Sequence, residues 1–183
     1  MSEKREHDLH FVLRYSDELH GHDTIVEHRK ILEKRGYVWM GKFGLGIAQT
    51  LVEKVNTQIE SGSASYVYLS AYSKIKYRAR VMRVVGGGVS ARLACPEKGA
   101  SPKYYASTPC SVWFKLSSIS DSSQADVKNL RLYNSPGLAP AFTSMRGLVY
   151  VTESSSGSRP MHREKKRTKK NQHADILLEE FDW

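Results

Sequence analysis

Apolar and polar residues alternate along the chain from position 9 to position 16. The apolar members of the alternation are Leu9, Phe11, Leu13 and Tyr15. Because successive side chains of a strand point to opposite faces, this pattern predicts a strand over residues 11–16. A helix is expected next, since Thr24 and Glu27 have the spacing of a capping box and Gly36 is a typical helix end.

A second helix and a pair of strands are predicted from the residues that follow. Apolar residues recur every four positions at Ile47, Leu51, Val55 and Ile59, so we expect a helix over residues 45–61 that buries these side chains. Two strands are expected over residues 66–72 and 74–81, joined by a tight turn near Ser73.

The second strand of this pair carries a row of cations. Its apolar face is expected to consist of Ile75, Tyr77, Ala79 and Val81, and its other face of Lys74, Lys76, Arg78 and Arg80. Side chains on one face of a strand lie about 7 Å apart, so four such cations suit successive phosphates of a nucleic acid. A solvated sheet face, where lysines discourage edge pairing, is the alternative.

The remaining part of the domain begins with a long irregular segment, residues 86–109, which contains Tyr104 and Tyr105 near its end. Loops of this length in compact domains are functional or disordered. A strand over residues 110–116 is expected to place Val112, Phe114 and Leu116 on one face and Trp113 and Lys115 on the other. Residues 130–134 then lead through a turn at Pro136 and Gly137 to a last strand over residues 147–151.

The composition changes near residue 153, so we divide the chain into a domain, residues 1–152, and a tail, residues 153–183. We expect the tail to be a disordered linker with six cations within residues 163–170, followed by an acidic and apolar terminal segment, residues 175–183. That segment either docks an effector protein, such as a nuclease or a motor, or folds back on the basic domain.

The chain is basic, and its excess charge belongs to the domain. The formal net charge is +9, whereas the residues from 153 onward hold 7 basic and 6 acidic side chains. A compact basic domain usually meets a polyanion, so nucleic acid is the expected partner.

Signatures of enzymes, cofactors and membranes are missing from the sequence. It has no Walker loop, no dinucleotide-binding glycine pattern and no HExxH, and we expect neither a cofactor nor catalysis. His20, His22, Asp23 and His28 are more typical of polar residues at a helix start than of metal ligands, so no metal is expected. Two cysteines without a metal-binding pattern and the lack of a run of about 20 apolar residues favour a cytoplasmic protein.

One tryptophan, Trp39, stands between the first helix and the glycine-flanked start of the second. Aromatic faces hold an unstacked base by stacking, which contributes roughly 1–3 kcal/mol per base. Trp39 at this place is either the wall of such a pocket or a residue of the core.

The order of these elements, with Trp39 before the second helix and 129–135 reading Asn-Leu-Arg-Leu-Tyr-Asn-Ser, resembles the YTH and EVE domains of the PUA-like superfamily. The resemblance covers about residues 9–152. It implies an α+β fold, a small mixed PUA-like β-barrel flanked by two or three helices with a disordered C-terminal tail. It also implies an aromatic pocket for a modified base, with Trp39 as one wall.

The remaining site residues are expected from the resemblance and from the row of cations. The modified-base pocket is expected to comprise Trp39, Tyr15, Ser16, Tyr104, Tyr105 and Trp113, and the backbone contacts are expected from Lys74, Lys76, Arg78, Arg80, Arg14 and Lys42. The family places further tryptophans in the loop before residue 110, where this chain has only the two tyrosines.

Similarity to the N-terminal domains of McrB-type restriction systems implies a reader of modified DNA that serves restriction or defence through a partner. Two alternatives remain. One is a PUA-like RNA-binding module in which Trp39 is core, and the other is an ASCH-like hydrolase of modified nucleosides with Asp17 or Glu18 as the catalytic group.

Overall fold

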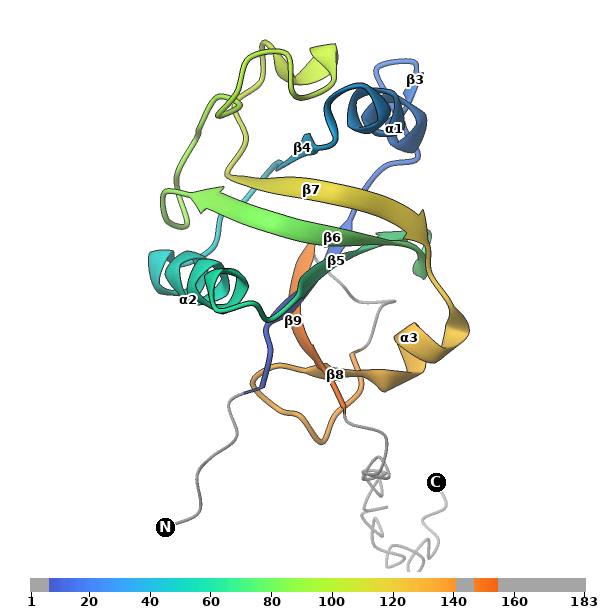
Figure 1. The fold of residues 1–183 in the computed structure, drawn as a ribbon, viewed down its shortest axis with the longest axis vertical. Helices are drawn as coiled ribbons and strands as arrows, with labels where there is room; N and C mark the ends of the chain where they lie inside the picture. The colour runs from blue at the N-terminus through green and yellow to red at the C-terminus, as the bar shows by residue number, and fades with distance from the viewer. Residues whose placement is uncertain (1–6, 141–146, 155–183) are drawn as a thin grey trace, which may run out of the picture.

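The protein is described here from a computed structural model, which describes residues 7–140 and 147–154 (Figure 1). The helices are α1 (Thr24–Arg35), α2 (Gln49–Glu60), a 3-10 turn η1 (Lys103–Tyr105) and α3 (Gln124–Asn129). The strands are β1 (His10–Arg14), β2 (Glu18–Leu19), β3 (His22–Asp23), β4 (Val38–Lys42), β5 (Ser65–Ala71), β6 (Lys74–Gly86), β7 (Val112–Asp121), β8 (Leu130–Leu132) and β9 (Leu148–Glu153).

Seven of these strands form one mixed sheet in the order β4-β7-β6-β5-β1-β9-β8. The β1 strand runs parallel to β5, and the other pairs are antiparallel. The expected α+β class is confirmed. The sheet curls like a barrel but does not close, since β4 and β8 remain its edges.

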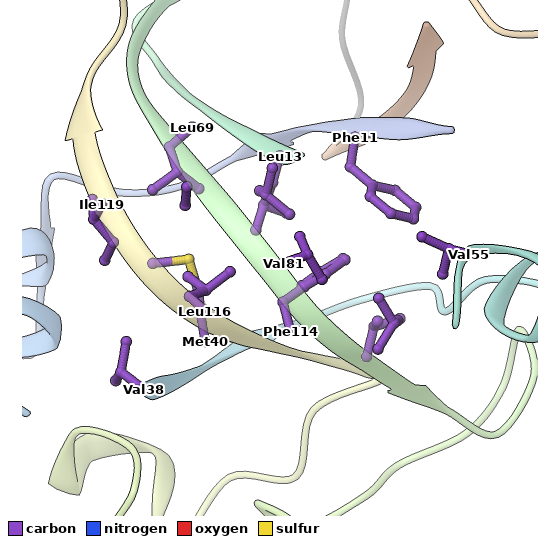
Figure 2. Packing of buried hydrophobic residues seen from close by; sticks show 14 of the residues in the cluster. Phe11, Leu13, Val38, Met40, Val55, Leu69, Val81, Phe114, Leu116 and Ile119 are labelled. Carbon is purple, nitrogen blue, oxygen red and sulfur yellow. The ribbon is translucent and has the colours of Figure 1, made fainter. Parts of the chain in front are cut away.

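The curl brings opposite parts of the sheet onto one core. Phe11 and Leu13 of β1 pack in the same buried cluster as Met40 of β4, although three strands separate β1 from β4 in the sheet (Figure 2). Register shifts in the β5–β6 and β6–β7 pairings accompany this curvature, as expected of β-bulges, which bend and twist a sheet locally. The packing of the core therefore holds β1 and β4 near each other, although they are not paired in the sheet.

Both expected helices are present, with different starts. The N-cap of α1 is Asp23, whose side chain accepts a hydrogen bond from the Val26 amide, so the predicted capping box of Thr24 and Glu27 is wrong. At the other end, Gly36 ends the helix in the left-handed conformation, as expected. The Thr24 hydroxyl instead donates to the Ser16 carbonyl at 2.6 Å.

Helix α2 begins at Gln49 rather than at residue 45. Of its expected stripe, Val55 is buried, Leu51 and Ile59 are partly buried, and Ile47 is buried ahead of the helix.

The strict alternation predicted for β6 is wrong at its start. Ile75 packs with the cluster of Val12 and Tyr68, whereas Tyr77 and Ala79 pack in the main core. The register with β5 shifts at this point, because Ser70 pairs with Ile75 and Leu69 with Tyr77. One extra residue, Lys76, reverses the faces, so the four cations do not form one straight row.

The long segment before β7 is ordered and covers the outer face of β4 and β7. A second buried cluster lies beneath it, formed by Trp39, Ala100, Tyr105, Cys110 and Trp113. The faces predicted for β7 are confirmed, because Val112, Phe114 and Leu116 pack in the main core while Trp113 lies in this second cluster.

Several predictions concern residues that the structure leaves undescribed. The linker, its cation run and the terminal segment 175–183 all lie outside the described residues. Within the part that is described, no helix combines the length and the apolar character needed to cross a bilayer.

Candidate nucleic-acid interface

A cavity of about 260 Å³ lies between the ends of β1 and β4, which the curl of the sheet brings close together. Its lining consists of Leu13, Arg14, Tyr15, Ser16, Leu19, Thr24, Met40, Gly41, Lys42, Phe43, Tyr105 and Gly147. Leu13 and Met40 are also members of the main core, so the inner part of the cavity is apolar (Figure 2).

Three aromatic residues line this cavity, and two of their rings, those of Tyr105 and Phe43, differ in accessibility. Tyr105 is 5% exposed, donates its hydroxyl to the Gly41 carbonyl at 3.1 Å and meets the Trp113 ring edge-on at 5.2 Å. Phe43 is 40% exposed, and its ring lies 5.6 Å from that of Tyr105 at an interplanar angle of 33°. A planar ligand can therefore reach Phe43 without displacing the core.

Lys42 holds the loop that presents Phe43. Its buried ammonium donates to the carbonyl of Phe43 at 2.9 Å and to that of Leu45. Removal from water lowers the pKa of the Lys42 ammonium. Lys42, which the sequence analysis expected to contact a phosphate, therefore donates its hydrogen bonds to carbonyl groups of the protein itself.

The loop is also held from its far side. The Gly46 amide donates to the Val89 carbonyl at 2.8 Å, and a Cβ at Gly46 would stand 2.3 Å from the Gly88 carbonyl oxygen. Only glycine allows this approach between the two loops without a shift. Phe43 is consequently exposed on a loop with a defined position.

One polar group of the lining lacks a partner. The Tyr15 hydroxyl is buried and makes no hydrogen bond of standard geometry with the described residues, although the Asp17 carboxylate is close. Burial, reinforced by Asp17, raises the pKa of the Tyr15 phenol, so the group stays protonated and able to donate. Ser16 is exposed beside it.

The predicted pocket residues separate into two groups. The cavity is lined by Tyr15, Ser16 and Tyr105, together with Arg14 and Lys42 from the predicted backbone contacts, whereas its lining does not include Trp39, Trp113 or Tyr104. Trp39 is 2% exposed, lies on the outer face of β4 and donates its indole N–H to Glu97 at 3.1 Å. Trp113 donates to the Leu93 carbonyl at 2.9 Å. In this structure both tryptophans belong to the core, which was the alternative for Trp39.

Sequence reasoning missed Phe43. The available signal was an aromatic residue among Gly41, Gly44 and Gly46, because glycines allow a loop to approach other backbone closely. The sequence placed Trp39 at a strand end, but it is the second residue of a five-residue strand that runs to Lys42. Phe43 follows the true end.

Two of the cations assigned to phosphate in β6 are engaged within the fold. Lys76 forms an ion pair with Asp17. Arg78 pairs with Asp126 at 3.4 Å and Glu153 at 3.0 Å. Lys74 and Arg80 are exposed, and neither forms an ion pair with a described residue. The row therefore offers two cations rather than four.

His20 and His22, part of the weak metal pattern, lie near the Tyr104 ring, and His28 is fully buried. Within the described ranges, no three side chains of the His, Cys, Asp and Glu types are grouped so as to hold a metal ion.

A curled mixed sheet, flanking helices and a small cavity between β1 and β4 together define a compact α+β domain. The family model described as Pua-like matches residues 11–145, and the chain belongs to this family. A PUA-like domain suggests nucleic-acid binding. Comparison with curated proteins and with solved structures gave no significant match.

Proposed function

We propose that this domain binds nucleic acid and reads one modified base in the cavity between β1 and β4, without catalysing a reaction. The observation that carries the proposal is the cavity's combination of the accessible Phe43 ring, the fixed Tyr105 ring and the buried Tyr15 hydroxyl, which makes no hydrogen bond of standard geometry with the described residues. Its volume of about 260 Å³ lies below the range of about 300–1,000 Å³ typical of drug-sized ligands, which suits a single planar heterocycle.

Each part of the cavity has a role in this proposal. Phe43 stacks on the base, a contact that contributes roughly 1–3 kcal/mol. The Tyr15 hydroxyl donates to an acceptor on the base edge. A methyl group on the base packs against Leu13 and Met40, and burying one such group contributes about 0.8 kcal/mol, or roughly fourfold in affinity.

The similarity to EVE and YTH domains, and to the N-terminal domains of McrB-type systems, supports modified DNA as the ligand and restriction or defence as the setting. The proposal therefore includes an effector protein, a nuclease or a motor, recruited by segment 175–183. This part rests on the resemblance and not on the geometry of the cavity.

The test measures binding of the purified full-length chain to matched oligonucleotides at about physiological salt. The probes are DNA and RNA, single- and double-stranded, unmodified or with N6-methyladenine, 5-methylcytosine or 5-hydroxymethylcytosine. We expect one modified probe to bind more tightly than its unmodified match by at least the roughly fourfold that one buried methyl group contributes. Equal affinity for all probes would overturn the reading of a modified base.

A matched pair of variants assigns the preference to the cavity. Phe43→Ala should abolish it while leaving general affinity in place, because the ring is partly exposed and its removal spares the core. Tyr72→Ala removes another exposed aromatic ring, 79% accessible at the turn between β5 and β6, and should bind as the wild type does.

A second candidate function is a PUA-like RNA-binding module without base preference. The burial of Trp39 and Trp113 favours it, because neither ring is available in this structure to enclose a modified base. It predicts tighter binding to RNA than to DNA with no effect of modification.

The hydrolase alternative depends on Asp17 or Glu18. Neither residue lines the cavity, and Asp17 is paired with Lys76. Turnover of free modified nucleosides by the purified protein would establish hydrolysis and contradict the proposed non-enzymatic role.

A further inference from the structure

A second hollow, of about 710 Å³, lies between α1 and the segment 98–104. Figure 1 shows this segment, in yellow-green, beside α1 at the top of the view. One wall comes from the helix and the other from the long loop, and both contribute cations. These are Lys30, Lys34, Arg35, Lys98 and Lys103.

The positive charge of this groove is largely uncompensated. Glu27 is the one carboxylate in its described lining, and it is already paired with Lys30 at 2.7 Å. In the part of the chain that the structure describes, Lys34, Lys98 and Lys103 form no ion pair, and all three are exposed. Lysines in the last turn of a helix also favour its dipole, but that does not account for the cations on the opposite wall.

The groove adjoins the base cavity through two neighbouring tyrosines. Tyr104 lines the groove and Tyr105 lines the cavity, and their rings lie 4.7 Å apart. Tyr104 is half-buried, and the ring of His22 lies nearly parallel to it at 6.4 Å. One pair of neighbouring rings therefore separates the cavity from the groove.

We propose that this groove holds the single-stranded backbone that flanks the base in the cavity, with Lys34, Lys98 and Lys103 on its phosphates and Tyr104 against a neighbouring base. A cationic track with an aromatic platform is what sequence-independent binding of single strands requires. The inference rests on the proposed function, and it places the phosphate contacts here rather than along β6.

The spacing of the cations fits this role. Lys30 and Lys34 are four residues apart on α1, about 6 Å along the axis. Lys98 and Lys103 face them from a loop anchored to β4, since the Trp39 amide donates to the Ala100 carbonyl at 2.8 Å. Both walls are therefore held by the fold.

The test compares two triple variants of the full-length chain. The first is Lys34→Gln with Lys98→Gln and Lys103→Gln. The control is Lys74→Gln with Arg80→Gln and Arg83→Gln, which removes three exposed cations from β6. Binding of an unmodified and a modified single-stranded oligonucleotide is measured over a salt series, and thermal melting verifies that each variant folds.

Each phosphate contact to a single strand contributes about 0.7 to the slope of log affinity against log salt. We expect the groove variant to lower the magnitude of this slope by about 2 on both probes and the control to leave it unchanged. An equal loss in both variants, a loss in the control alone, or no loss in the groove variant would each overturn the inference.

The two proposals fail in different ways. The ratio of affinities for modified and unmodified probes depends on the cavity, so the groove variant should keep the wild-type ratio while Phe43→Ala loses it. If the wild type shows no preference for a modified probe, the proposal that the cavity reads a modified base is wrong. If the groove variant nevertheless lowers the slope of log affinity against log salt, the assignment of the phosphate contacts to the groove stands.

Discussion

At the scale of single residues, the carboxylate of Glu97 fixes the position of Trp39. It accepts hydrogen bonds from the Tyr37 hydroxyl at 2.6 Å, the Trp39 indole at 3.1 Å and the Lys115 ammonium at 2.8 Å. These donors, with Lys115 foremost, lower the pKa of Glu97 to about 2. A residue of the long loop thereby ties the loop to β4 and β7.

Glu97→Gln should make the protein less stable and less sensitive to acid. The folded-state pKa lies below the unfolded value near 4.5, so this stabilisation is present above pH 4.5 and is lost as the pH falls toward 2. With a side chain 37% exposed, we discount for solvent screening and expect a loss of about 1 kcal/mol at neutral pH, or 2–4 °C in Tm. Thermal melting between pH 7 and pH 2 measures the difference in Tm between the wild type and the variant. If that difference were the same at every pH, the stabilising role of the Glu97 carboxylate would be contradicted.

At the scale of elements, the turn between β5 and β6 is under conformational strain. It is a two-residue turn, and both residues, Tyr72 and Ser73, have positive φ, 48° and 64°. Tyrosine and serine adopt this region at a cost, whereas asparagine and glycine favour it in such hairpins.

Tyr72→Asn combined with Ser73→Gly should therefore stabilise the protein by about 1 kcal/mol, seen as a higher urea midpoint at unchanged slope. Few contacts are lost, since Tyr72 is 79% exposed. Ser73→Ala is the control and should give no gain, because alanine keeps the unfavourable conformation. A lower midpoint for the double variant would show that the turn has another requirement.

Element patterns were largely predictable because they depend on near neighbours in the sequence. The alternation in residues 110–116 assigned both faces of β7 correctly, and Gly36 ended α1 as expected. The bulge at Lys76 was not predictable, since it arises where the pairing of β6 with β5 shifts. The short helix α3 was also missed, although Ser123 and Asp126 form its capping box.

At the scale of the whole molecule, Arg78 joins segments far apart in the sequence. Its guanidinium lies 3.6 Å from the centre of the Tyr66 ring and pairs with Asp126 of α3 and with Glu153 of β9. This cation therefore links the central sheet to the C-terminal part of the domain, and its phosphate contact stays a prediction.

Arg78→Met should destabilise the protein by about 2 kcal/mol, because two partly buried carboxylates lose their partner. Arg80→Met, on the same strand but exposed, should have an effect within about 0.5 kcal/mol. Urea unfolding of both variants measures the difference. If Arg78→Met kept full stability and lost only nucleic-acid affinity, the residue would be a phosphate contact after all.

The sequence by itself determined the inward faces of β1 and β7 and the basic character of the domain, because periodicity and charge are local or additive properties, and the family resemblance implied the α+β class. The tertiary structure decided which aromatic rings and cations remain available. The indole of Trp39 donates to Glu97, 58 positions away, and Lys76 pairs with Asp17, 59 positions away. The cavity likewise exists because the curl of the sheet brings the ends of β1 and β4 together. Such pairings depend on long-range packing, which residue spacing does not encode.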